Sequence, residues 1–378
     1  MLKIVAVGDI MPGGLLSITN TEFATAEVRG FLASGDLRVG NFECAIEVEN
    51  PGGKKYKAGG NTIFCREKDA ERVKDLGIDI VSIANNHLFD LGPEGAFKAI
   101  EVLDELGIKH CGAGRNLVEA QKPVVVNWEG KTFAFLAFAD TRLDFMYEAS
   151  EATPGVNPLH EEYVLSQISN ASCQFDYVIV IPHWGKENTY FPTFEVELLS
   201  KKMIEAGACL VLGGHPHRIQ PVVNYYHRKS VVYSMGNFLF SNRIINVPRY
   251  TWYPKEPIDI STLPRTLGCP LVDTPTIKLW RPLAYIGMMV KCKIEGNRIR
   301  TRLKLTYTNM DNCVEILKKG KLRQHFILKL LGITIKLGMY KATCSFCDSY
   351  LKGETWFFIK LKKCQKVVKR AIAFLGGN

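Results

Sequence analysis

Six short apolar runs each lead into a side chain that can ligate a metal ion or move a proton. The residues at these points are Asp9, Glu43, Asn85 to His87, His183, His215 with His217, and Asn237. Any one of these residues could have a purely structural role, since Asp9 could cap a helix and Asn85-Asn86 could form a turn. Packing alone does not account for the same donor types after six successive runs. The pattern therefore predicts one shared site.

Divalent cations at hydrolytic sites take carboxylate, amide oxygen and imidazole ligands. The ligands that we expect are Asp9, Glu43, Asn86, His183, His215 and His217. These donors suit Mn²⁺, Fe²⁺ or Zn²⁺, and one or two ions; a pair about 3.5–4 Å apart can clamp a phosphoryl group and activate water. Beside them, we expect His87 to act as general acid or to stabilise a leaving oxygen, with Asp90 fixing its tautomer through the other ring nitrogen.

The apolar runs before these residues have the composition of buried strands. They are 4–8 residues long, rich in Val and Ile, and closed by Gly or Pro, as in residues 177–182 and 208–214. Segments with helical spacing alternate with them, at 67–76, 94–106 and 194–206. Strands and helices in alternation predict an α/β fold whose sheet is flanked by helices, with the polar groups at one edge of the sheet.

Two hairpins are expected, one pairing 123–128 with 131–139 and the other pairing 285–294 with 298–307. The proline-rich segment 248–282 has no clear period and is interpreted as an irregular loop or lid. Residues 1–307 are therefore assigned to one domain. From Val314 onward the apolar spacing is helical, so 308–378 is predicted to be a basic, amphipathic helical tail.

The net charge of +10 over 378 residues is concentrated in this tail. From Cys313 onward there are 14 basic and three acidic residues, which leaves the first 312 residues at −1. A basic amphipathic helix can lie on an anionic membrane face, although packing of its apolar stripe on the body explains the pattern equally well. No nucleic-acid reading motif accompanies the charge, so no nucleic-acid partner is expected.

No secretory signal or membrane span is visible in the sequence, and the 11 cysteines form no tight framework. We therefore expect a reducing compartment. The localisation that follows is cytoplasmic, with peripheral attachment to the inner face of the membrane as the option that the tail adds. The lone Cys344–Cys347 pair gives a weak indication of a zinc or redox site, because no second pair or His ligand flanks it.

The motifs as a set resemble the CapA family of bacterial capsule and poly-γ-glutamate synthesis proteins. The matching segments are Gly8-Asp-Ile-Met11, Gly40-Asn-Phe-Glu43, Ala84-Asn-Asn-His87 with Asp90, His183-Trp-Gly185 with Glu187, Gly214-His-Pro-His217, and Tyr233 to Phe238. The resemblance covers about residues 1–242. It implies a metallophosphoesterase-like four-layer α/β/β/α sandwich with its metal site at one edge, and the ligand and catalytic roles given above. For Glu187 and Asn237 it implies a site-shaping role.

At one position this chain differs from the related phosphoesterases, and the difference leaves two hypotheses for its function. Related phosphoesterases have His two residues after the first Asp, whereas this chain has Met11, a soft ligand. The first expectation is a metal-dependent hydrolase or transferase that acts on a cell-surface polymer or its precursor. The second is a non-catalytic, metal-stabilised scaffold that binds a polymer or a synthase.

Overall fold

Two β-sheets packed against each other form the centre of the protein. The structure, a computed structural model, describes residues 1–49, 61–142, 147–225, 228–246, 249–268 and 270–317. The first sheet has the order β22-β21-β20-β1-β2-β5-β6, with β15 also paired to β1. Its strands are β1 (Leu2–Met11), β2 (Leu37–Phe42), β5 (Ile80–Ser82), β6 (Lys109–Cys111), β15 (Asn237–Phe240), β20 (Ile286–Glu295), β21 (Arg298–Thr308) and β22 (Val314–Ile316).

The second sheet has the order β13-β14-β12-β11-β9-β8. Its strands are β8 (Val124–Trp128), β9 (Lys131–Ala139), β11 (Tyr177–His183), β12 (Ala208–Leu212), β13 (Val222–Tyr225) and β14 (Lys229–Val232). One apolar core runs between the two sheets and includes Ile4 and Cys292 from the first and Phe135 and Leu210 from the second. Strands buried on both faces are near-continuous in Val, Ile and Leu, as β1 and β12 are.

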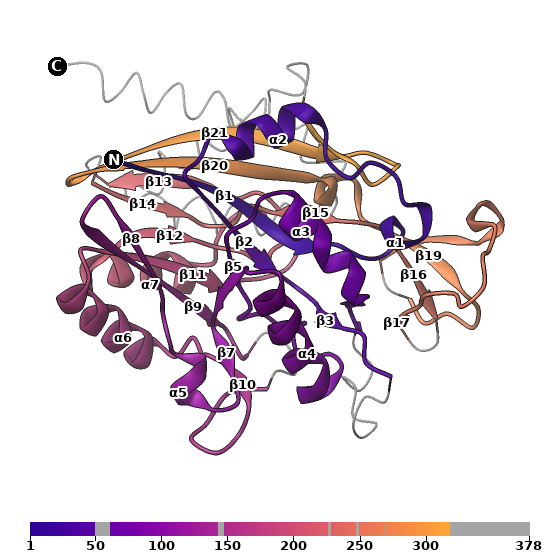
Figure 1. The fold of residues 1–378 in the computed structure, drawn as a ribbon, viewed down its shortest axis with the longest axis horizontal. Coiled ribbons are helices and arrows are strands. Elements are labelled where there is room, and N and C mark those ends of the chain that lie inside the picture. Colours follow the sequence, from indigo (N-terminus) through magenta and orange to yellow (C-terminus); the bar gives the residue numbers. More distant parts are fainter. Residues whose placement is uncertain (50–60, 143–146, 226–227, 247–248, 269, 318–378) are drawn as a thin grey trace. The chain divides into compact units, whose positions relative to one another are not determined.

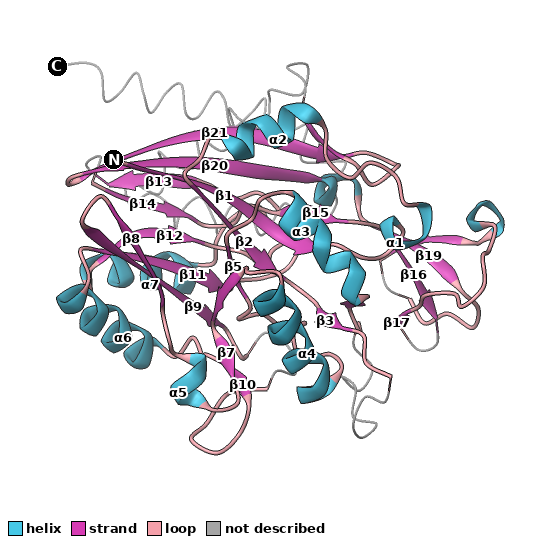
Figure 2. Ribbon diagram, in the orientation of Figure 1, coloured by secondary structure: helices cyan, strands magenta, loops and turns pink. Residues whose placement is uncertain are grey.

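Helices lie on the outer sides of both sheets (Figure 2). Those beside the first sheet are α2 (Ala26–Ala33), α3 (Glu71–Asp75) and α4 (Gly92–Glu105), and those beside the second are α6 (Glu161–Gln174) and α7 (Phe194–Glu205). In α4, the residues Ala96, Ala99, Val102 and Leu103 are buried at helical spacing, and Gly107 follows with a φ of 68°. The predicted α/β arrangement of helix-flanked sheets is confirmed.

Short elements complete the described chain. They are α1 (Leu16–Thr19), α5 (Leu117–Ala120), β3 (Ala45–Ile46), β4 (Phe64–Cys65), β7 (Ala113–Gly114) and β10 (Gly155–Val156), and the 3₁₀ turns η1 (Glu67–Ala70), η2 (Ile260–Thr262) and η3 (Pro282–Tyr285). The helix expected at 67–76 is thus a 3₁₀ turn followed by the short α3. No helix in the described ranges is long and apolar enough to cross a membrane.

Both predicted hairpins are confirmed, as β8–β9 and β20–β21, each antiparallel. β20 also pairs antiparallel with β1, so the second hairpin extends the first sheet beyond its parallel strands. In Figure 1 these two long strands lie side by side at the margin of that sheet.

The segment 248–282, interpreted as an irregular loop or lid, contains three short strands in its described residues. β16 (Arg243–Asn246), β17 (Tyr250–Thr251), β18 (Arg265–Leu267) and β19 (Thr276–Leu279) form a separate four-stranded sheet. The strands escaped notice because each has only two to four residues, too few to establish a period of two.

The helical period predicted from Val314 is wrong at its start. Val314–Ile316 form β22, which pairs antiparallel with β21, so the first sheet continues past residue 307, to Ile316. The helical interpretation of 318–378, including Cys344 and Cys347, lies outside the described residues and stays a prediction.

Candidate metal centre

Parallel strands of both sheets end at the candidate metal centre. β1, β2 and β5 run parallel in the first sheet, and β11 and β12 run parallel in the second. Asp9 lies near the end of β1, Glu43 directly follows β2, and His183 is the last residue of β11. Because parallel strands present their carboxyl ends at one edge, residues far apart in the sequence meet here. All eight predicted site residues are at most 4% exposed.

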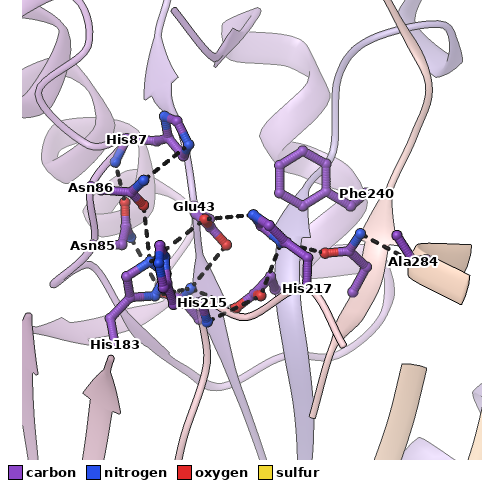
Figure 3. Close-up of polar contacts among 12 residues, drawn as sticks. Glu43, Asn85, Asn86, His87, His183, His215, His217, Phe240 and Ala284 are labelled. Atoms are coloured by element: carbon purple, nitrogen blue, oxygen red, sulfur yellow. Dashed lines mark hydrogen bonds and ion pairs between the residues drawn. The ribbon is translucent and has the colours of Figure 1, made fainter. Parts of the chain in front are cut away.

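The first donor group contains Glu43, His183 and His215, whose candidate ligand atoms lie within 4.8 Å of one another. His183 Nε2 is 3.1 Å from His215 Nδ1 and 3.6 Å from Glu43 Oε1. Asn86 Oδ1 lies 2.9 Å from the same His183 nitrogen. Ligands held about 2.1 Å from one ion are themselves about 3.0–3.4 Å apart, for octahedral and tetrahedral angles. The separations fit a divalent cation among these four residues (Figure 3).

The second group contains Asp9, Glu43 and His217, again within 4.8 Å. His217 Nε2 is 3.7 Å from Glu43 Oε1, the oxygen that also faces His183. His217 Nδ1 contacts Asn237 Oδ1 at 2.8 Å, and the Asn237 amide donates to the Ala284 carbonyl at 3.1 Å. That chain makes Asn237 Oδ1 an acceptor, so Nδ1 carries the proton and the lone pair of Nε2 faces Glu43. The two groups thus share one carboxylate oxygen.

His87 lies at the border of the first group. Its Nδ1 is 2.6 Å from Asp90 Oδ2, which also accepts from the Ile63 backbone N–H at 2.7 Å. Its Nε2 lies 3.3 Å from Asn86 Nδ2, next to the ligand set. The carboxylate therefore orients the ring, and the other ring nitrogen, Nε2, is directed toward the amide of a candidate ligand.

Backbone strain and close approach position the donors. His215 has a φ of 95° and His217 has a φ of 50°. Both values lie in the left-handed region, where a residue other than glycine is strained by about 1–3 kcal/mol. At Gly8, an added Cβ would lie 1.8 Å from the Gly236 carbonyl oxygen, to which Asp9 N–H donates at 2.9 Å. Only glycine allows β1 and the turn before β15 to approach this closely.

Burial and mutual charge set the protonation of the centre. Burial lowers the pKa of His215 to about 4, and burial followed by the charge of His215 lowers the pKa of His183 well below its usual value. Burial would raise the pKa of Asp9, but hydrogen bonding to His217 and the charges of the imidazoles lower it to about 2. At neutral pH Asp9 is therefore ionised and His183 and His215 are neutral, the forms that bind metal ions.

The small sheet forms an aromatic wall beside His217. The Trp280 ring, just after β19, is 4.9 Å from the His217 ring and 4.9 Å from the Phe240 ring. Lys278 Nζ lies 4.1 Å from the centre of the Trp280 ring. The exposed Glu187 lies near this lysine: desolvation raises its pKa, but the charges of nearby imidazoles and of Lys278 lower it overall. An acidic side chain, Glu187, and a basic one, Lys278, therefore lie at the border of the metal centre.

Three of these residues were not among the predicted ligands or catalytic groups. Asn41 donates to Asp9 Oδ1 at 2.9 Å, and Asn237 orients His217. Both lie within motifs of the resemblance, which implied a site-shaping role for Asn237 and is the signal that could have pointed to Asn41. Trp280 belongs to a segment without a recognisable pattern, and nothing in the sequence pointed to it. Met11, in contrast, is fully buried in the apolar core and belongs to neither donor group.

Comparison with known proteins gives a family match over residues 3–242, to the model described as bacterial capsule synthesis protein PGA_cap. The chain is 31% identical over 249 residues to the capsule biosynthesis protein CapA of Bacillus anthracis, covering 63% of this chain and 60% of that protein. It is 32% identical over 241 residues to the PGA biosynthesis protein CapA of Bacillus subtilis, covering 62% of each. The chain thus spans about three-fifths of the length of these relatives.

Among solved structures, a phosphatase from Mycoplasma pneumoniae aligns with 86% of this chain and 98% of its own, at 11% identity and a TM-score of 0.45. At this similarity the alignment says nothing about function.

Proposed function

Since the chain belongs to the family of bacterial capsule synthesis proteins described as PGA_cap, we propose that it is a metal-dependent, phosphoesterase-like hydrolase or transferase of cell-surface polymer synthesis. The polymer is a polysaccharide or poly-γ-glutamate, or a precursor of either. The observation that carries the proposal is the pair of donor groups that share Glu43, with His87 and Asp90 beside them.

The donor set fits a divalent cation, because it offers carboxylate, amide and neutral imidazole groups. Glu43, His183, His215 and Asn86 would hold one ion, and Asp9, Glu43 and His217 a second. Bound there, such ions polarise a phosphoryl oxygen and lower the pKa of a water molecule.

The other residues act through geometry and protons. Asn237 holds the His217 ring with Nε2 turned to Glu43, and Asn41 holds the Asp9 carboxylate from the neighbouring strand. Asp90 holds the Nδ1 proton of His87, so that Nε2 is the nitrogen that can pass a proton to a leaving oxygen. The buried setting strengthens each of these interactions relative to water.

The test is turnover of an aryl phosphodiester with Mn²⁺ by purified protein. His87→Ala should lower kcat by about 10²- to 10⁴-fold, the usual contribution of general acid catalysis, while metal content stays unchanged. His160→Ala, at an exposed histidine that contacts Glu148, is the matched control. Equal rates for wild type and His87→Ala would refute catalysis by this residue.

Asp90→Asn tests the positioning role separately. Loss of the carboxylate should lower kcat less than His87→Ala and change the pH profile of kcat, because the neutral amide supports the imidazolium less well. An unchanged pH profile would show that Asp90 has only a structural role and does not influence the protonation of His87.

The alternative, a metal-stabilised scaffold, is favoured by one observation. Met11 stands where related phosphoesterases have a His ligand, and it is buried in the core. Elemental analysis of fresh protein separates the two proposals: two tightly held ions favour catalysis, and one or none favours a scaffold. His215→Ala in parallel shows whether the bound metal belongs to this centre.

A further inference from the structure

The β20–β21 hairpin carries all seven of its charged residues on one face. They are Lys291, Lys293 and Glu295 on β20 and Arg298, Arg300, Arg302 and Lys304 on β21. Six of the seven are positive. The residues between them on the other face, such as Cys292, Ile294 and Ile299, are buried in the core between the sheets. The alternation of a strand therefore separates a basic outer face from an apolar inner one.

The register places like charges directly opposite one another. Lys293 pairs with Arg300 on β21 and with Lys3 on β1, and Lys291 pairs with Arg302. Side chains of directly opposed residues start about 5 Å apart, and like charges at that distance destabilise a sheet. The charges of Lys293, Arg302 and Lys3 contribute to the lowered pKa of Lys291, after its partial burial. Stability does not explain this arrangement.

Few acidic groups neutralise the face. Asp36 lies 3.6 Å from Lys3, and Glu27 lies 4.0 Å from Lys304. Lys293, Arg300 and Arg302 are exposed, and within the described part of the chain none of them has an ion pair. The exposed part of the face is therefore Lys293, Arg300 and Arg302. Together with the half-buried Lys3, which faces Asp36, and Lys291, which lies over the Phe31 ring, they form a basic patch spread over three adjacent strands.

We propose that this basic patch binds the anionic surface of a phospholipid membrane. The patch covers an area three strands wide, which a plane of lipid headgroups can contact all at once, whereas an extended polyanion follows one row of charges. Long Lys and Arg side chains can reach headgroups while their stems lie along the sheet.

The sequence beyond the described residues supports the same partner. The chain leaves β22, which pairs with β21, and enters 318–378 with 14 basic and two acidic residues. Apolar residues alternate with these cations, for example Leu361, Val367, Val368 and the run Ala371 to Leu375. Apolar side chains among cations suit a lipid interface, where acyl chains accept them, better than they suit a soluble polyanion.

The patch is distant from the metal centre. Lys3 precedes Asp9 by six residues along β1, about 20 Å at ~3.3 Å per residue. Membrane binding through the patch therefore leaves the centre uncovered, and substitutions in the patch should leave its chemistry unchanged.

The experiment uses the full-length chain and vesicles of phosphatidylcholine, with and without phosphatidylserine. Because each Lys or Arg near an anionic surface contributes about fivefold, the triple variant Lys293→Gln, Arg300→Gln, Arg302→Gln should bind anionic vesicles about a hundredfold more weakly. Its thermal midpoint should equal or exceed that of wild type, since like-charge repulsion is relieved.

Two matched variants make the result specific. Lys68→Gln, Lys109→Gln, Lys122→Gln removes the same charge from exposed positions outside the hairpin, and should change binding by no more than a fewfold. Lys293→Arg, Arg300→Lys, Arg302→Lys keeps the charge and should keep binding. Three results would overturn the proposal: wild-type binding by the hairpin variant, equal loss in both glutamine triples, or loss of soluble polyglutamate binding with vesicle binding unchanged.

Discussion

Replacing His215 by Asn should reduce the dependence of stability on pH in the metal-free protein. Burial holds the pKa of His215 at about 4 in the folded state, against 6.5 for an ordinary imidazole. In the unfolded chain the ring takes up a proton as the pH falls through 6.5, whereas the folded protein resists this until about pH 4. The unfolded state therefore binds more protons in this window, and the folded state loses stability as the pH falls from 6.5 to 4.

The magnitude follows from the shift of about 2.5 units. At 1.36 kcal/mol per unit, the full effect is about 3.4 kcal/mol, of which about 2 kcal/mol develops between pH 7 and pH 5. His183 adds to the wild-type dependence in the same direction, and the charge of His215 is the second cause of its lowered pKa. Removing His215 therefore relieves His183 as well. Asp9 contributes only at lower pH, because its pKa moves from 3.8 to about 2.

The assay is urea unfolding of chelator-treated protein at several pH values from 7.5 to 5. Wild type should lose at least about 2 kcal/mol more of its free energy of unfolding over this range than His215→Asn does. His160→Asn, which removes an exposed imidazole, is the control for the loss of any histidine. If His215→Asn and wild type have parallel pH profiles, the ring is not held neutral by burial and the account of the centre is wrong.

Two further substitutions test how the centre is supported. Asn237→Ala removes the acceptor that holds His217 Nδ1–H and should weaken Mn²⁺ or Zn²⁺ binding by about 10- to 100-fold in calorimetric titration; unchanged affinity would show that the ring needs no such support. Gly8→Ala should destabilise the protein by about 3 kcal/mol or more in urea unfolding, because its Cβ would overlap the Gly236 carbonyl. Gly30→Ala in α2, where the added Cβ would meet open space, should be neutral or stabilising. Similar values for both variants would contradict the close approach of β1 to β15.

Many of the strands and candidate ligands could be predicted from local patterns in the sequence. The runs that became β1, β2, β11 and β12 are long enough and apolar enough to read as buried strands, and the polar residues that follow them are donors of the right chemistry. The β8–β9 and β20–β21 hairpins have turn residues at the expected places. Pattern failed where elements are short, as in β16 to β19, and where Val314–Ile316 became an edge strand because β21 was available to pair with it.

The residue types along the chain determined that donors for a metal ion follow successive strands, since strand periodicity and side-chain chemistry are local properties of the sequence. Only the tertiary structure decided how they meet. Glu43 Oε1 faces both His183 and His217, Asn237 fixes one ring nitrogen, and Trp280 packs on the same imidazole. These relations depend on the register of β1 with β2 and β15 and on the packing of the two sheets. Contacts between residues that are distant in the sequence have no local signature, so neither the strand register nor the packing of the sheets could be predicted from spacing alone.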